Sequence, residues 1–339
     1  MPVKHKKIEP QQRAHSPQLA AGLASEYKNK IKSPYGRRFP AACCRVLQSF
    51  LIKSKFHLFL VIFLSLGLSI NACSRKQLIV PKITPDLTEQ RLVGKFVWFD
   101  LFTHDLESSS RFYEELFGWT FQDTLSGEKN IKTIKRNGVP IANAVYVNPK
   151  KSNVNESQWL SYMSVEDVDR AAMTVKQNNG SIYMRPKDLP DRGRVAVVID
   201  PEGALFAMVT ATGGDPADQD FIENDWMGSE LWTRNLDETL NFYHVLAGYE
   251  TELADVGANR KYHLLIRDNK VRAGAVNIPW DDVKANWVPY IAVEDATSIA
   301  NKVEKLGGKL LIAPDQEIRE GRVAIIADPS GAVFAIQQF

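Results

Sequence analysis

The sequence predicts an α+β protein built from four βαβββ units, two in each of two consecutive domains. Two observations lead to this fold. One pair of sequence blocks occurs twice along the chain, and each copy alternates in the order strand, helix and three strands. Because both blocks return at nearly the same distance, the repeat is a duplicated domain and not a solenoid repeat of roughly 20 to 50 residues.

The first repeated block combines an acidic residue at a helix start, a Phe-Tyr pair and a glycine where the helix ends. It covers residues 101–119 and returns over residues 231–249, an offset of 130. The second block, residues 193–207, contains an Asp-Pro-x-Gly turn and returns over residues 321–335, an offset of 128. The near-equal offsets indicate that a whole domain was copied.

Apolar periodicity defines the elements of the first domain. A strand is expected over 95–103, followed by a helix over 106–117 with Asp105 as its N-cap. Asn137-Gly138 is a strong hairpin signal. The remaining strands of the first unit are expected over 119–122, 130–135 and 140–148. The second unit is expected as a strand at 159–165, a helix at 167–178 and strands at 181–184, 194–199 and 204–210.

The second domain repeats this scheme, with helices expected over 236–247 and 295–306. Gly213, Gly214 and Pro216 indicate a linker, since glycine and proline cluster in connections. We therefore expect domains over 92–212 and 227–339 with a linker over 213–226. Because both copies are complete, we expect a monomer with paired domains or, as the alternative, a homodimer.

An export signal is expected ahead of the repeat. Residues 53–73 comprise a lysine flank, a run of apolar residues shorter than a bilayer span and Ala72-Cys73. The ending resembles the lipobox of bacterial lipoproteins, which implies that Cys73 carries lipid. We expect a lipid-anchored protein of the bacterial cell envelope, on the periplasmic side of the outer membrane, and an uncleaved membrane anchor is the alternative.

The flanking segments follow from this signal. Residues 1–52 are polar and basic, and we expect them to be a disordered extension or to precede the true translation start. Residues 74–91 are polar with two prolines, which suits an extended tether. Residues 1–73 hold twelve Lys and Arg against two Asp and Glu, which leaves thirty against thirty-eight and a net charge of −8 in the remainder. An acidic surface disfavours nucleic-acid binding.

The helix-start acid, the Phe-Tyr pair, the Leu-Phe-Gly-Trp helix end and the Asp-Pro-x-Gly hairpin together resemble the vicinal oxygen chelate superfamily. Glyoxalase I, extradiol dioxygenases and the bleomycin and fosfomycin resistance proteins belong to it. The resemblance covers residues 92–339. It implies that paired βαβββ units form two half-barrel domains, each enclosing a cavity that holds a divalent metal or a small molecule.

The resemblance also implies where metal ligands would lie, one on the first and one on the last strand of each unit. Histidine, glutamine or glutamate would be expected at these positions. The corresponding residues here are Trp98, Leu160, Ala207, a residue near Ala142, Gly228, Val288, Ala335 and, in the least defined position, Ala275. None of these side chains suits a metal. We therefore expect no metal or other cofactor, with a weakly held divalent ion as the alternative.

Other residues on the same strand faces are candidates for binding a small polar ligand. Alternation along a strand places Asp100 on the face of Trp98, and Tyr162 on the face of Leu160. Glu230 and Tyr290 repeat this arrangement in the second domain. His263, which lies on an expected strand, and Trp98, which could line an apolar pocket, are further candidates. The alternative for each acid and tyrosine is a structural hydrogen bond inside the barrel.

Three functions remain open at this stage. The first is a metal-independent module that binds a small apolar or aromatic molecule in one or both cavities. The second is a lyase or isomerase of the glyoxalase and dioxygenase type that uses a cavity carboxylate with a tyrosine, with or without a divalent metal. The third is a scaffold with collapsed cavities. Empty metal positions favour the first and third functions over the second.

Overall fold

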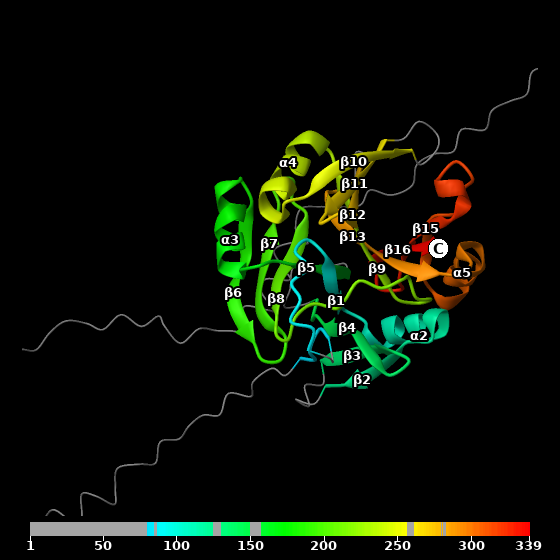
Figure 1. Cartoon of the computed structure of the whole chain (residues 1–339). Helices are drawn as coiled ribbons and strands as arrows, with labels where there is room; N and C mark the ends of the chain where they lie inside the picture. Colours follow the sequence, from blue (N-terminus) through cyan, green and yellow to red (C-terminus); the bar gives the residue numbers. More distant parts are fainter. Residues whose placement is uncertain are drawn as a thin grey trace, which may run out of the picture. The chain divides into compact units, whose positions relative to one another are not determined.

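The computed structural model describes residues 80–84, 87–124, 130–149, 157–255, 261–278, 280 and 283–339. It confirms the α+β class: two eight-stranded mixed sheets, each assembled from two βαβββ units (Figure 1). Cys73, the signal over 53–73 and the extension over 1–52 lie outside the described residues. Within the described part, no helix is long and apolar enough to cross a membrane.

Each unit contributes one strand, one helix and a three-stranded meander. The first domain consists of β1 (Phe96–Thr103), α2 (Leu106–Phe117), β2 (Thr120–Asp123), β3 (Ile131–Arg136), β4 (Val139–Tyr146), β5 (Gln158–Ser164), α3 (Val168–Gln177), β6 (Ser181–Leu189), β7 (Gly193–Ile199) and β8 (Leu205–Ala211). The second consists of β9 (Trp226–Thr233), α4 (Leu236–Ala247), β10 (Glu250–Asp255), β11 (Lys261–Arg267), β12 (Lys270–Asn277), β13 (Asn286–Val293), α5 (Ala296–Val303), η1 (Glu304–Leu306), β14 (Lys309–Ile312), η2 (Arg319–Gly321), β15 (Val323–Ala327) and β16 (Val333–Gln338).

Local sequence explains where the elements start and stop. The Asp105 carboxylate accepts a hydrogen bond from the Ser108 backbone N–H at 3.0 Å, as an N-cap does. Helix α2 ends at Gly118, whose φ of 68° is left-handed. Asn137 and Gly138 both have positive φ, the requirement of a type I′ hairpin turn. The N-cap, the helix-ending glycine and the Asn-Gly turn therefore lie where the sequence predicted them.

The two units of each domain join through their first strands. In the first sheet the order is β2-β3-β4-β1-β5-β8-β7-β6, with β1 and β5 antiparallel, and the second sheet repeats this order. Side chains alternate between the two faces of these strands. One face of each sheet packs on helices and on the other domain, and the opposite face forms the interior of a half-barrel.

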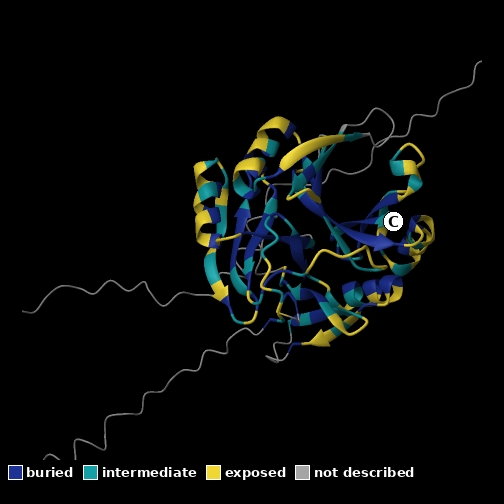
Figure 2. Cartoon of the chain, viewed as in Figure 1, coloured by how far each residue is buried: buried dark blue, intermediate teal, exposed yellow. Residues whose placement is uncertain are grey.

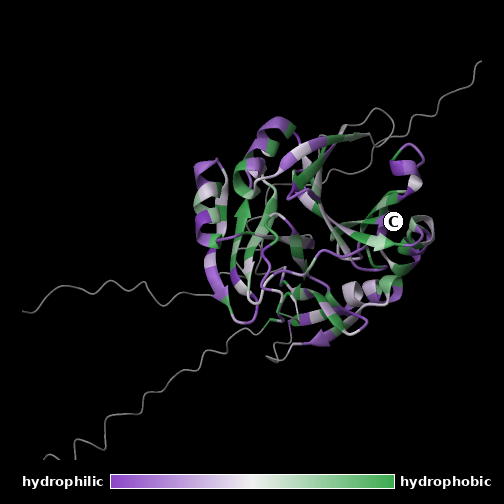
Figure 3. Ribbon diagram, viewed as in Figure 1, coloured by the Kyte–Doolittle hydropathy of each residue, from purple (hydrophilic) through white to green (hydrophobic). Residues whose placement is uncertain are grey.

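The apolar residues form three clusters that follow this division. The largest cluster contains residues of both domains, including Phe99 and Trp226, whose rings stack with centroids 4.1 Å apart. Two smaller clusters line the half-barrels, one around Trp98 and Tyr162 and one around Tyr290. Figures 2 and 3 show the buried, apolar strands between helices whose outer faces are exposed and polar.

The two repeated sequence blocks meet across the domain interface. Ser109 on α2 donates to the Asp328 carboxylate of the second Asp-Pro-x-Gly turn at 2.9 Å. In the other copy, Tyr243 on α4, one helical turn beyond the counterpart of Ser109, donates to Asp200 of the first turn at 3.0 Å. Accordingly, α2 lies beside α5, and α3 lies beside α4 (Figure 1). In each contact a helix of one domain binds the Asp-Pro-x-Gly turn of the other. The two domains are therefore paired within one chain.

The two turn aspartates are buried at this interface. Burial raises the pKa of both Asp200 and Asp328 above the ordinary value, although backbone N–H groups that donate to each carboxylate oppose the shift. Asp328 accepts from the backbone N–H groups of Ser330 and Ala332 at 2.9 Å each. These carboxylates therefore serve mainly as acceptors that hold a turn and a neighbouring helix together.

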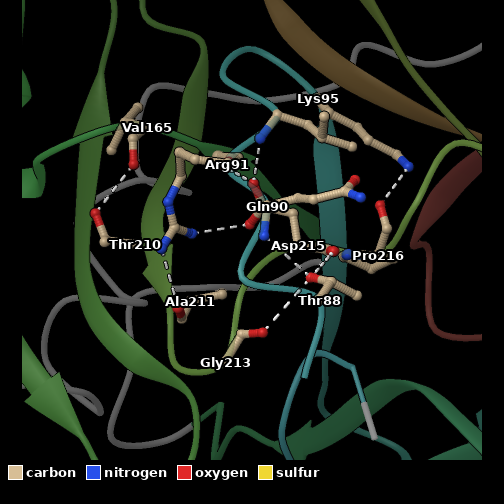
Figure 4. Close-up of polar contacts among 12 residues, drawn as sticks. Thr88, Gln90, Arg91, Lys95, Val165, Thr210, Ala211, Gly213, Asp215 and Pro216 are labelled. Atoms are coloured by element: carbon tan, nitrogen blue, oxygen red, sulfur yellow. Dashed lines mark hydrogen bonds and ion pairs between the residues drawn. The ribbon is translucent and has the colours of Figure 1, made fainter. Parts of the chain in front are cut away.

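The interdomain linker is held against the start of the first domain (Figure 4). The buried Asp215 carboxylate accepts from Arg91 at 3.0 Å and from the Leu92 backbone N–H at 2.6 Å. Thr88 donates to the Asp215 carbonyl at 2.6 Å. We call this group, residues 88–92 with Asp215, the clamp. The tether predicted over 74–91 is therefore fixed along its described part, because the clamp and residues 80–84 both pack on the first domain.

Asp328 gives a prediction for stability. The Asp328→Asn variant keeps an acceptor oxygen for the two backbone N–H groups, whereas Asp328→Ala leaves both unpaired and should cost about 1–3 kcal/mol for each. Because the folded pKa of Asp328 is raised, its ionised form opposes folding, so wild-type stability should fall relative to Asp328→Asn as pH rises from 3.8 through the raised pKa. Urea unfolding at several pH values measures both effects; equal stabilities for the Asn and Ala variants would contradict this role.

Candidate functional site

The second half-barrel contains an open cavity of about 720 Å³. This volume lies in the range of small-molecule sites. Its wall combines polar groups at the base with apolar groups towards the mouth. Its lining includes Phe221, Glu230, Tyr262, Val271, Gly274, Tyr290 and Arg319.

Glu230 on β9 is the carboxylate inside this cavity. Its Oε1 accepts from Trp232 Nε1 at 2.8 Å and from the Tyr290 hydroxyl at 2.9 Å. Its other oxygen, Oε2, accepts from Arg319 Nη2 in an ion pair. A buried carboxylate needs such partners, since an unpaired charge in an apolar environment is costly. The carboxylate is thus held in one orientation by three donors.

Arg319 reaches the cavity from the 3₁₀ turn η2, which precedes β15. Its backbone and that of Glu320 both adopt positive φ, and Arg319 Nη1 also donates to Gln337 at 2.9 Å. The guanidinium lies 4.3 Å from the Tyr262 ring centroid and 5.5 Å from that of Tyr290. Such stacking on aromatic faces favours a cation. Arg319 therefore links the carboxylate to both tyrosines.

Burial and charge determine the protonation of this cluster. Burial by itself would lower the pKa of Arg319, but Glu230 and the two tyrosines outweigh it and raise that pKa. Burial, reinforced by the Glu230 charge, raises the pKa values of Tyr290 and Tyr262. Arg319 is hence a permanent cation, and both tyrosines keep their hydroxyl protons. The site offers neutral hydroxyl groups beside a fixed ion pair.

Glycines keep the second half-barrel open. A Cβ atom at Gly274 would lie 1.8 Å from the Tyr262 hydroxyl oxygen, so a side chain there would displace the tyrosine. Gly228 occupies the position that Trp98 has in the first domain. Phe221 and Val271, which are 53% and 58% exposed, add apolar surface to the cavity wall. A ligand would meet polar groups at Glu230 and apolar groups near solvent.

The first half-barrel contains the same acid and tyrosine, but it is closed. The Asp100 carboxylate accepts from Tyr162 at 2.5 Å, from Trp98 Nε1 at 2.8 Å and from Asn143 at 3.1 Å. All four side chains are buried. Asp100 and Tyr162 are thus hydrogen-bonded directly to each other.

An arginine and a short segment complete this first cluster. Arg192, from the loop before β7, lies 3.9 Å from Asp100 and 4.2 Å from the Trp98 ring centroid. Residues 80–84, which we call the strap, cover it. Val80 and Ile83 of the strap are buried against the apolar lining, and the Pro81 carbonyl accepts from Arg192 Nε at 3.0 Å. The strap thus occupies the space that is open in the second domain.

The structure brings most of the predicted site residues together in pairs. Asp100 lies with Tyr162 and Trp98, and Glu230 lies with Tyr290, each group inside its own half-barrel. His263 does not line the second cavity, whereas its strand neighbours Tyr262 and Leu264 do. Alternation places His263 on the opposite face of β11.

Sequence reasoning missed both arginines and Tyr262. Arg192 and Arg319 lie in or beside turns, so strand periodicity gives no information about where they point. The available signal was positional: each arginine comes within two residues before the glycine that begins the second repeated block. The strap was missed because Pro81 and Pro85 indicated an exposed tether.

The family's metal positions do not fit a metal in this chain. The structure confirms that Trp98, Leu160 and Ala207 line the first half-barrel. It corrects two positions by one residue: Asn143 and Gly274 point into the half-barrels, whereas Ala142 and Ala275 belong to the shared core. Among the residues that the structure describes, no three His, Cys, Asp or Glu side chains form a metal-binding group.

The charge at Glu230 also opposes a metal. Arg319 already neutralises this carboxylate and places a fixed positive charge in the cavity. A divalent cation would have to displace the guanidinium or bind beside it, and like charges repel. The donor set therefore suits an uncharged or amphipathic organic molecule better than a metal ion.

Comparisons with known proteins agree with this architecture. Residues 95–208 match the profile of the Glyoxalase/Bleomycin resistance protein/Dioxygenase superfamily. The match covers most of the first domain, and both domains have the βαβββ architecture of this superfamily. The second domain repeats the strand order of the first sheet.

Curated relatives match over most of both domains. A protein named "Putative glyoxylase CFP32", found in Mycobacterium tuberculosis and Mycobacterium bovis, is 29% identical over 243 residues, which are 70% of this chain and 92% of the relative. The anthracycline biosynthesis proteins DauV of a Streptomyces species and DnrV of Streptomyces peucetius are 27% and 28% identical, over 72% of this chain and 92% of each relative.

Solved structures show the same fold. The Mn(II)-bound glyoxalase from Novosphingobium aromaticivorans has a TM-score of 0.51 and 16% identity, over 73% of this chain and 82% of its own. The 2,2',3-trihydroxybiphenyl 1,2-dioxygenase from Sphingomonas wittichii also has a TM-score of 0.51, with 10% identity over 73% and 91% of the two chains. At these identities the likeness concerns the fold alone.

Gly274 provides a test of the cavity geometry. The Gly274→Ala substitution should push Tyr262 away from Arg319, because the new methyl group would overlap the tyrosine hydroxyl. We expect a loss of stability of about 1–3 kcal/mol from this overpacking. The same substitution in a Tyr262→Ala background should cost much less, because the clash is gone. Additive losses in a double-mutant cycle by urea unfolding would show that the two residues do not meet.

Proposed function

We propose that this protein binds a small amphipathic molecule in the cavity of the second domain, without a bound metal. The observation that carries the proposal is the open cavity whose base holds Glu230, Arg319 and two tyrosine hydroxyls. Pockets with an apolar wall and a few fixed polar groups are typical of small-molecule sites. Polar groups of the ligand would face Glu230 and Arg319, and its apolar body would contact Phe221 and Val271.

The geometry supports binding over proton abstraction. A general base needs a free lone pair within reach of the substrate proton. Glu230 instead accepts from Trp232, Tyr290 and Arg319, so its carboxylate is engaged in fixed contacts. Arg319 has N–H groups beyond those that bind Glu230 and Gln337, and these can donate to carbonyl or hydroxyl oxygens on a ligand.

The relatives named for anthracycline biosynthesis support a ligand of a particular shape. Anthracyclines are planar, polycyclic and rich in carbonyl and hydroxyl groups, and a cavity of about 720 Å³ is large enough for a drug-sized aromatic molecule. Aromatic walls and hydrogen-bond donors at the base match this chemistry. We therefore infer a planar aromatic ligand that carries oxygen acceptors.

Fluorescence titration with an anthracycline tests the proposal. We expect one molecule bound per chain, and Arg319→Met should weaken binding at least tenfold, about 1.4 kcal/mol, because it removes the charged donor at the base. Arg194→Met serves as a matched control, since Arg194 pairs with Asp169 and Asp188 at the surface of the first domain. Equal affinity of the Arg319→Met and wild-type chains would refute the site.

Metal content tests the second part of the proposal. Purified protein should contain much less than one equivalent of Mn, Fe, Ni or Zn per chain, and chelator treatment should leave anthracycline affinity unchanged. One tightly held equivalent that chelation removes together with binding would overturn the metal-free site.

We also propose that the protein acts at the bacterial cell envelope, anchored by lipid on Cys73. The lysine-flanked apolar run that ends at Ala72-Cys73 supports this location. Replacing Cys73 by Ser should move the protein from the membrane fraction to the soluble periplasmic fraction. Full membrane retention of the variant would instead favour an uncleaved anchor.

A further inference from the structure

The first half-barrel contains polar atoms that its present contacts leave unsatisfied. Arg192 and Asn143 are each 1% exposed. Within the described residues, Nη2 of Arg192 and Oδ1 of Asn143 have no hydrogen-bond partner. Buried polar atoms without partners are unusual, and each one lowers stability relative to a satisfied group. One is a donor and the other an acceptor, so a single ligand with both functions could satisfy them.

The strap fills this half-barrel in the manner of a bound ligand. Its Pro81 carbonyl accepts from Arg192 Nε, and Val80 and Ile83 contribute apolar surface to the cluster around Trp98 and Tyr162. The strap therefore contacts the lining of the half-barrel through two apolar side chains and one carbonyl oxygen. A small molecule of similar chemistry could replace them.

The clamp determines how the strap is attached. Thr88, Arg91 and Leu92 are bound to Asp215, so the chain just after the strap is fixed to the domain. A short covalent connection gives the strap an effective concentration on the order of millimolar at the half-barrel. A free ligand must therefore bind well enough to compete with the strap at this effective concentration, and without such a ligand the strap keeps the half-barrel closed.

We propose that the first half-barrel is a second ligand site, which the strap occupies as a displaceable internal ligand. The site takes a neutral molecule with an apolar body, a carbonyl that accepts from Arg192 and an N–H or O–H group that donates to Asn143. A charged acid is disfavoured because Asp100 already lies 3.9 Å from Arg192. This site is independent of the cavity in the second domain.

Thiol labelling tests whether the strap opens. Ile83→Cys is introduced into a chain whose three native cysteines are replaced by serine, and Met208→Cys, in the buried strand β8, is the matched control. We expect the thiol at position 83 to react with a thiol reagent at least 100-fold faster than the thiol at position 208 under native conditions. The strap peptide, residues 78–84 with blocked ends, should raise the rate at position 83 further at millimolar concentration. Equal rates at the two positions would show that the strap leaves only on global unfolding and would overturn the proposal.

Peptide binding tests the vacated site directly. A chain carrying Val80→Asp and Ile83→Asp should bind the fluorescently labelled strap peptide at least tenfold more tightly than the wild type does, and adding Arg192→Met should remove the gain. Leu87→Asp is the control, because Leu87 is exposed and lies outside the strap. A folded double variant that gains no peptide affinity would contradict the proposal. If circular dichroism shows that the double variant is unfolded, the labelling experiment decides.

Discussion

A carboxylate inside an apolar half-barrel must be neutralised, and in both domains an arginine from the turn before the Asp-Pro hairpin does this. Arg192 approaches Asp100, and Arg319 pairs with Glu230. Each guanidinium also lies over aromatic rings, which favour a cation. Because each carboxylate is already neutralised, the open cavity suits the donors and acceptors of an organic molecule better than a metal ion.

Both domains contain a buried cluster of carboxylate, tyrosine and arginine, but one half-barrel is closed and the other is open. The first half-barrel is filled by Trp98, Asn143 and the strap, whereas the second has Gly228 and Gly274 at the positions of those two side chains. The pairing of repeated blocks at Asp200 and Asp328 is kept in both copies because each domain needs the other to bury its helix. The two domains therefore share one core but differ in the interiors of their half-barrels.

The sequence predicted elements and strand faces well, because both depend on local periodicity. Helix α2 and its Asp105 cap follow from spacing, whereas the inward direction of Glu230 and Tyr290 follows from the ligand positions that the resemblance implies together with strand alternation. Ala142 and Ala275 were wrong by one residue, since β-bulges shift the register beside both strands. Arg319 and the strap depend on tertiary contacts of turns and termini, for which periodicity carries no signal. The fold was therefore more predictable than the chemistry of the sites.

Soaking crystals of the full chain with small oxygen-bearing aromatic fragments tests the central claim most directly. We expect fragment density in the second half-barrel, with an oxygen within hydrogen-bond distance of Arg319, Tyr262 or Tyr290 and the aromatic ring towards Phe221. Fragments that bind only at the domain interface, or a metal ion coordinated by Glu230 with Arg319 turned away, would contradict it.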